Sequence, residues 1–126
     1  MELLRNAGAL NNLGMVLHAM GDYSAALSVF EEALDLDAHS GAVNSNLARV
    51  LLELRQYELS EEHARRAQKD ESTERGALLI LASISRFKGL YREAEKYYSR
   101  LLSLDPGNLS ALCGRAGLYQ MLGDFS

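Results

Sequence analysis

The 126-residue sequence has one cysteine, Cys113, one proline, no tryptophan and no long hydrophobic run. A single cysteine excludes an intrachain disulfide, so a reducing compartment, the cytoplasm, is the expected location. The longest apolar run, ALLILASI from Ala77 to Ile84, is much shorter than the roughly 20 residues that a membrane-spanning helix requires. The N-terminus also lacks a basic segment followed by an apolar one. We therefore expect neither membrane insertion nor a secretory signal peptide.

What the sequence does contain is typical of an ordinary helical protein. Apolar residues make up 48% and charged residues 24% of the chain, which argues against a disordered or fibrous protein. A length of 126 residues is enough for one hydrophobic core and too short for two independent ones. We therefore predict a single folding unit.

Charge is spread unevenly along the chain, whose net charge is −4. Residues 7–40 carry a net charge of −5 with no Lys or Arg, residues 41–74 carry −2, and residues 75–108 carry +3. Such a gradient would steer a charged partner or favour head-to-tail contact between copies, although charge runs of this size usually form solvated faces. Because acidic residues outnumber the basic ones and interleave with them, we do not expect a nucleic-acid partner.

The sequence repeats itself every 34 residues. The stretch LGMVLHAMGDYSAALSVFEEAL, from Leu13, aligns with LARVLLELRQYELSEEHARRAQ, LASISRFKGLYREAEKYYSRLL and RAGLYQMLGDFS, which begin at Leu47, Leu81 and Arg115. Small and aromatic residues recur in three columns: Gly14, Ala48, Ala82, Ala116; Tyr23, Tyr57, Tyr91, Phe125; and Phe30, Ala64, Tyr98. A fixed period without insertions indicates supersecondary units that stack on one another.

Each unit divides into two amphipathic helical patterns separated by a turn. In the first unit, apolar residues recur with helical spacing before and after Gly21 and Asp22. The two apolar stripes, which we expect to face each other, are Leu10, Leu13, Gly14 and Leu17, and Ala26, Phe30, Ala33 and Leu34. Ser40 and Asn108 are placed to cap the first helices of the units that follow them. The predicted unit is therefore a helix, a turn and a helix.

At these residues the sequence resembles the tetratricopeptide repeat family. The resemblance implies an all-α fold of tandem helix-turn-helix repeats of 34 residues, stacked into a right-handed α-solenoid whose concave surface is lined by the first helix of each pair. The repeats would span residues 7–40, 41–74 and 75–108, followed at 109–126 by the first helix of a truncated fourth repeat. The second repeat departs from the family pattern at Asn44, Ala64 and Ser72, and we expect looser packing there.

The predicted fourth-repeat helix carries an apolar stripe, comprising Leu112, Leu118, Tyr119 and Leu122. In a complete array this stripe would pack on a second helix. We therefore expect the chain to be part of a longer protein, or this helix to contact another molecule.

Reactive side chains are too scattered to form a catalytic or metal site. His18, His39 and His63 fall in three separate elements and do not have the spacing of metal ligands, so we expect them to be surface residues. Cys113 has no histidine in register with it. Neighbouring acids such as Glu31 and Glu32 point in different directions on a helix, which is wrong for shared acid–base work. We predict a protein that is not an enzyme and binds no cofactor or metal.

The side of each first helix opposite its apolar stripe forms the predicted binding groove. Its residues are Asn12, Met15, Asn46, Arg49, Ile80, Ser83 and Phe87. Asparagine amides bond both the N–H and the C=O of an extended peptide, and Asn12 and Asn46 would form two stacked rungs. Asn11 would lie at the edge of the groove as a tolerated polar residue. The asparagine ladder that some family members have at this place stops at Ile80.

Family members that bind chaperone tails grip an acidic C-terminal peptide with lysines, asparagines and an arginine. The corresponding positions here are Asn11, Met15, Asn46, Gly76 and Ile80. Only Asn46 agrees with that pattern, so we do not expect chaperone-tail binding. Arg49 either pairs with an acid of the ligand or with Glu53, one helical turn away.

The leading hypothesis is a non-enzymatic interaction scaffold that binds an extended peptide, or a helix of a partner protein, in the concave groove. One alternative is a structural assembly subunit that self-associates head-to-tail or through its uncapped C-terminal helix. The other is a substrate-recognition arm of a larger enzyme. The fold serves many functions, so only the chemistry of the groove distinguishes these hypotheses.

Overall fold

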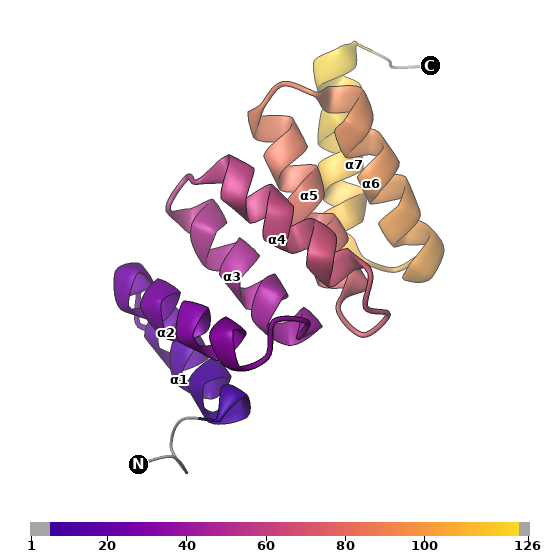
Figure 1. Ribbon diagram of the computed structural model, residues 1–126. Helices are drawn as coiled ribbons and strands as arrows, with labels where there is room; N and C mark the ends of the chain where they lie inside the picture. The colour runs from indigo at the N-terminus through magenta and orange to yellow at the C-terminus, as the bar shows by residue number, and fades with distance from the viewer. Residues whose placement is uncertain (1–5, 124–126) are drawn as a thin grey trace.

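The computed structural model describes residues 6–123 (Figure 1). This part of the chain forms seven α-helices and no strand, which confirms the predicted fold class. The helices are α1 (Ala7–Ala19), α2 (Tyr23–Leu36), α3 (Gly41–Glu53), α4 (Tyr57–Gln68), α5 (Glu74–Phe87), α6 (Tyr91–Leu104) and α7 (Leu109–Leu122). None of them is both long enough and apolar enough to cross a membrane. Phe125, the last member of the aromatic column, lies outside the described residues.

The helices stack in sequence as pairs, with α1 against α2, α3 against α4, α5 against α6, and α7 against α6 (Figure 1). The first helices of neighbouring pairs also contact each other, α1 with α3 and α3 with α5. The second helices of neighbouring pairs, such as α2 and α4, make less contact with each other. The first helices therefore form the inner layer of the stack. The surface they share is the concave one.

Side-chain caps fix where α1, α3 and α7 begin, whereas Thr73 at the start of α5 makes no such hydrogen bond. Asn6 Oδ1 accepts a hydrogen bond from the Ala9 amide at 2.7 Å, and Asn108 Oδ1 accepts one from the Ala111 amide at 2.9 Å. Ser40 Oγ caps α3 in the same way. Each cap satisfies an amide that the helix itself leaves unpaired. The predicted caps Ser40 and Asn108 are confirmed.

Helices approach each other most closely at two glycines. A Cβ atom on Gly14 would overlap the ring of Phe30 on α2, and one on Gly114 would overlap the ring of Tyr98 on α6. Leu10 of α1 is buried in the same cluster as Ala26 and Phe30 of α2. Leu13, predicted to face α2, is instead exposed.

The second repeat is not loosely packed, contrary to the sequence-based expectation. Ala64, which stands where the family has an aromatic residue, is fully buried in a cluster that includes Ile80 of the next repeat. Asn44 is buried as well, and its amide is satisfied: Nδ2 donates to the Ser40 carbonyl at 2.9 Å, and Oδ1 pairs with His63 Nδ1 at 2.8 Å. A polar pair here takes the place of apolar packing.

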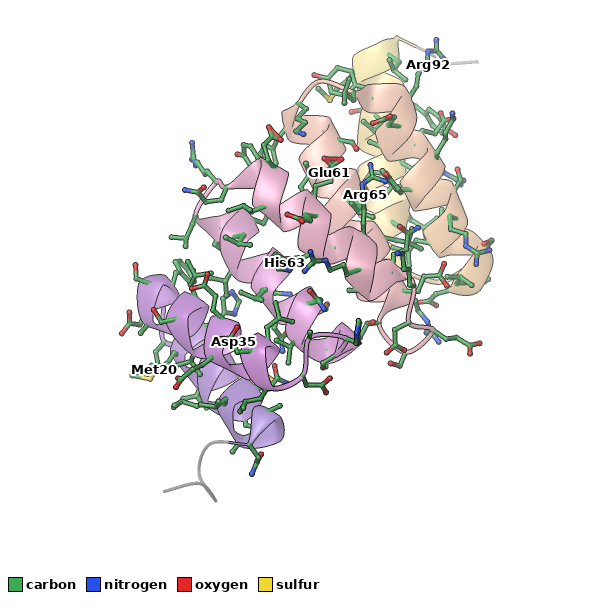
Figure 2. The ribbon with its side chains drawn as sticks, viewed as in Figure 1. Met20, Asp35, Glu61, His63, Arg65 and Arg92 are labelled. Carbon is green, nitrogen blue, oxygen red and sulfur yellow. The ribbon has the colours of Figure 1, made fainter. Side chains whose placement is uncertain are left out.

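His63, labelled in Figure 2, is therefore not the surface residue expected from the sequence. It lies half-buried between α4 and α3. Burial disfavours the imidazolium, and the nearby Arg66 adds repulsion that outweighs the attraction of Glu62, so the pKa of His63 lies below its usual value.

We predict that alanine substitutions at two glycines of α7 have opposite effects on the free energy of unfolding. Gly114→Ala places a methyl group in the Tyr98 ring and is expected to cost about 1–3 kcal/mol. At Gly117 the nearest atom to an added Cβ is Arg86 Nη2 at 4.0 Å, so Gly117→Ala is expected to gain about 0.5–1 kcal/mol of helix propensity. Urea unfolding followed by circular dichroism measures both. Equal effects of the two substitutions would contradict the packing of Tyr98 on Gly114.

The second prediction concerns pH. Because the pKa of His63 is lower in the folded than in the unfolded protein, the unfolded state takes up the proton first, and the free energy of unfolding falls as the pH drops from about 7 to about 5. Replacing His63 by Gln removes this titration and flattens that part of the profile. The matched control is His39→Gln at the exposed His39, which should leave the slope unchanged. Urea unfolding at a series of pH values tests this, and an unaltered slope in His63→Gln refutes it.

Candidate interaction surface

Side chains of the inner helices line up across the concave face at two levels. The first level consists of equivalent positions on the four inner helices: Met15, Arg49, Ser83 and Gly117. The second level lies one helical turn further along each helix and consists of Ala19, Glu53, Phe87 and Met121. Met15, Phe87 and Met121 are exposed even though they are large and apolar. An apolar row of this kind on one face of a protein is typical of a surface that binds other molecules.

Three clefts follow this face, each between two neighbouring inner helices. The first, between α1 and α3, has a volume of about 80 Å³ and is lined by Met15, His18, Phe30, Asn46 and Arg49. The second, of about 380 Å³, is lined by Leu52, Glu53, Arg55, Tyr57, Ser83 and Phe87. The third, of about 320 Å³, is lined by Ser83, Arg86, Phe87 and Met121. Phe87 and Ser83 belong to both larger clefts.

A larger cleft, of about 780 Å³, lies away from the concave face, between the α2–α3 turn and the end of α4. It contains no residue of the predicted groove. Its polar groups mostly bond to one another or to close neighbours: Arg66 pairs with Glu62 at 3.1 Å, and Asp70 accepts hydrogen bonds from Ser72. We therefore consider the concave face the better candidate for an interaction surface.

Five of the predicted groove residues, Met15, Asn46, Arg49, Ser83 and Phe87, line these clefts. The Ser83 hydroxyl already donates to the Leu79 carbonyl at 3.0 Å within its own helix. Whether any of these residues binds a ligand stays a prediction.

The predicted asparagine rungs are arranged differently from the expectation. Asn46 Nδ2 donates to Asn11 Oδ1 at 2.8 Å, so Asn46 pairs with Asn11 rather than with a ligand backbone. Asn12 is exposed and lines none of the three clefts. Asn11, expected at the edge, is the half-buried partner that joins α1 to α3.

Ile80 does not lie on the surface of the groove. Only 5% of its side chain is exposed, and it packs in a cluster with Ala48 and Ala64 of the preceding repeat. Gly114, at the same position of the next unit, is likewise buried against Tyr98. This position of the repeat faces the preceding helix pair. That explains why it is exposed at Asn12, since no helix pair precedes Asn12 within residues 6–123.

Arg49 and His18 have unused bonding capacity. No carboxylate between residues 6 and 123 lies within ion-pair distance of Arg49, so it does not pair with Glu53; its only hydrogen bond runs to Asn46 Oδ1 at 3.5 Å. His18 Nε2 is buried and finds no hydrogen-bond partner in the same range of residues. Sequence reasoning placed His18 on the surface, although its position three residues after Met15, on the same side of α1, signalled the groove.

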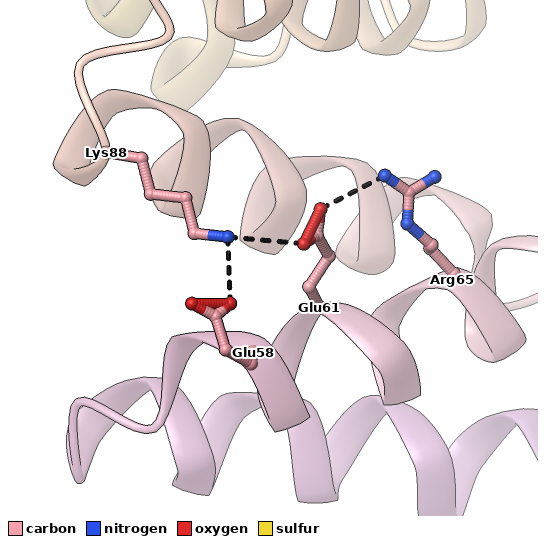
Figure 3. A network of polar contacts seen from close by, with 4 residues as sticks. All are labelled: Glu58, Glu61, Arg65 and Lys88. Carbon is pink, nitrogen blue, oxygen red and sulfur yellow. Dashed lines mark hydrogen bonds and ion pairs between the residues drawn. The ribbon is translucent and has the colours of Figure 1, made fainter.

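Most ion pairs lie elsewhere and link the second repeat to the third. Lys88 Nζ contacts Glu58 at 3.1 Å and Glu61 at 3.4 Å, and Arg65 contacts Glu61 at 3.0 Å (Figure 3). Burial alone would raise the pKa of the Glu61 carboxyl, but hydrogen bonds from Arg65 and Lys88 outweigh it and hold that pKa below its usual value. Within residues 6–123, no three His, Cys, Asp or Glu side chains come together as a metal site.

Two family models described as tetratricopeptide repeat match the chain, one over residues 17–83 and the other over residues 76–108. None of the curated protein sequences matches it. Among solved structures, the first TPR of Spaghetti (RPAP3) bound to the HSP90 peptide SRMEEVD is similar with a TM-score of 0.87 at 22% identity, covering 93% of each chain.

Two further structures give the same result. The Arabidopsis OM64 TPR domain has a TM-score of 0.87 at 20% identity, covering 91% of this chain and 95% of that one. MamA has a TM-score of 0.88 at 19% identity, covering 97% of this chain and 74% of that one. At these identities the likeness shows the fold, and it is the fold predicted from the 34-residue period.

The third prediction tests the pairing of Asn46 with Asn11. If the two amides bond each other, the effects of Asn11→Ala and Asn46→Ala on the free energy of unfolding are not additive, and the coupling energy is about 0.5–1.5 kcal/mol. Asn12→Ala combined with Asn46→Ala is the matched control and is expected to be additive within about 0.5 kcal/mol. Urea unfolding of the single and double variants measures both cycles. Additive effects of Asn11→Ala and Asn46→Ala would contradict the pairing of the two amides.

Proposed function

The chain belongs to the tetratricopeptide repeat family, and we propose that it is a non-enzymatic interaction module that binds an extended peptide, or a helix of a partner protein, along its concave face. The cytoplasm is the proposed location, because the chain has a single cysteine. The residues of the concave face position a ligand and carry out no chemistry on it.

The observation that carries this proposal is the exposed aromatic ring of Phe87 between two clefts. Phe87 is 67% exposed, lies flat against Tyr57 with 5.5 Å between ring centroids and 16° between ring planes, and lines both larger clefts of the face. Stacking on Tyr57 holds the ring in place before a ligand arrives. A rigid aromatic side chain between two pockets is the usual centre of binding energy in a protein interface.

Peptide binding by structural neighbours supports the proposal. The RPAP3 domain mentioned above is bound to an HSP90 peptide, and the second TPR domain of human RPAP3 is in complex with the HSP70 peptide SGPTIEEVD. The family positions that hold such tails are Asn11, Met15, Asn46, Gly76 and Ile80 here; only Asn46 agrees with the family pattern, and none of the five is cationic. We therefore propose a different peptide, held by apolar contacts to Phe87 and Met121.

Self-association is the second candidate function, and the exposed side of α7 favours it. Leu109 is 75% exposed, and Leu112 and Leu122 are exposed on the same helix. Leu118, which the sequence placed with them, is buried against α6 instead. A second copy of the chain covering these leucines would remove apolar surface from water.

The fourth prediction tests the concave face. Peptides selected from a random phage-displayed library against this protein are expected to bind with micromolar affinity, and Phe87→Ala should weaken them about tenfold because the central ring is lost. Leu59→Ala is the matched control, since Leu59 is a 47% exposed apolar residue on α4, outside the three clefts. Fluorescence anisotropy with synthetic peptides measures the dissociation constants.

Two outcomes would contradict the proposal. One is a selected peptide that loses as much affinity with Leu59→Ala as with Phe87→Ala. The other is a failure to select any peptide while sedimentation equilibrium shows dimers that Leu109→Ser dissociates, which would favour the second candidate function.

A further inference from the structure

The small cleft between α1 and α3 contains a buried nitrogen that lacks a partner. His18 Nε2 is inaccessible to solvent and bonds to no group between residues 6 and 123. The imidazole is held from the other side by Tyr23, whose ring centroid lies 5.4 Å away at an angle of 45°. A buried polar atom without a hydrogen bond is rare in folded proteins and requires an explanation. An external group that completes the hydrogen bond is one.

The same cleft is lined by a cation without a carboxylate. Arg49 makes one long hydrogen bond, to Asn46 Oδ1, and its guanidinium reaches toward Gly76 on α5, where a Cβ atom would lie 3.9 Å from Nη2. Asn46 is itself fixed by Asn11. A guanidinium has five N–H donors, so most of those on Arg49 are available to a ligand.

From these contacts we propose that His18 and Arg49 form a subsite for a carboxylate carried by the bound peptide. A guanidinium binds a carboxylate with paired N–H donors, and a protonated imidazole nitrogen donates to a carboxylate oxygen. The cleft volume of about 80 Å³ leaves room for a carboxylate group.

The charges around the cleft agree with an anionic ligand. α1 contains no acidic residue; the acids of residues 7–40 all lie on α2 or in its flanking turns. Glu53, one turn beyond Arg49 on α3, lines the neighbouring cleft rather than this one. The subsite uses positions other than those of the chaperone-tail pattern, and it rests on the proposed function because it selects among peptides in the same groove.

The fifth prediction uses small carboxylates as probes. Acetate, titrated at constant ionic strength, is expected to shift the ring signals of His18 and the guanidinium signals of Arg49 in NMR spectra, saturating in the millimolar range. Acetamide, its neutral isostere, should not shift them. Arg49→Gln is expected to weaken acetate binding about tenfold, because a charged hydrogen-bond donor is lost, and His18→Phe, which keeps an aromatic ring beside Tyr23, should weaken it as well. Arg92→Gln, on α6, removes the same charge elsewhere and should change nothing.

Two further probes distinguish the sources of the carboxylate. N-acetylglycine presents the C-terminal carboxylate of a peptide, and N-acetylaspartic acid α-amide presents a side-chain carboxylate. Tighter binding of the first assigns the subsite to a peptide end, and tighter binding of the second assigns it to an acidic side chain. If neither binds as well as acetate, a peptide cannot place its carboxylate in the cleft, and the proposal fails.

Shifts that grow linearly with acetate, occur equally with acetamide or persist in Arg49→Gln would overturn the subsite. This failure differs from that of the proposed function. Library peptides that depend on Phe87 while acetate leaves His18 unaffected would refute the subsite alone. Saturable acetate binding by a protein that selects no peptide would refute the groove function, and the subsite could then no longer be assigned to a peptide.

Discussion

The stack depends on one constraint, which is that a side chain on each second helix must match in size the residue that faces it on the next first helix. Tyr98 is large and packs on Gly114, which has no side chain. Ala64 is small, and the larger Ile80 fills the same cluster. Phe30 shares a cleft of about 80 Å³ with the polar Asn46. Close packing tolerates neither overlap nor large voids, so these pairs vary together.

This matching explains the composition of the concave face. The repeat position that holds Asn46, Ile80 and Gly114 takes part in stacking and leaves little for a ligand. The proposed ligand contacts fall at the positions three and seven residues later, where the side chains of Arg49 and Phe87 remain accessible. Where stacking is imperfect, between Phe30 and Asn46, the face gains a small polar cleft. The first cleft therefore differs in chemistry from the two clefts beside Phe87, which combine that ring with Glu53, Arg55 and Arg86.

The sequence predicted where the helices lie along the chain, but it did not predict how each helix is rotated about its own axis. A 34-residue period with caps at Ser40 and Asn108 locates the starts of α3 and α7, since local chemistry determines them. Whether Asn11 or Asn12 meets Asn46 depends on about 100° of rotation per residue, and tertiary packing against the preceding repeat decides it. Likewise, the hydrogen bond between Asn44 Oδ1 and His63 Nδ1, which satisfies the buried Asn44 side chain, joins residues of two helices. No periodicity within one helix predicts it.

Two of the basic residues between 75 and 108 form ion pairs inside the molecule. Lys88 contacts Glu58 and Glu61, and Arg100 contacts Glu74 at 3.2 Å, so cations of the third repeat neutralise acids of the second. Pairs as exposed as these contribute less than about 1 kcal/mol each, but they withdraw the basic surplus from head-to-tail attraction between copies. Arg49 has no such partner among residues 6–123 and lies in the groove. The first cleft therefore carries a cation without a carboxylate partner in the described part of the chain, whereas the other two clefts carry Glu53, Arg55 and Arg86, so the charge of the concave face changes from one cleft to the next.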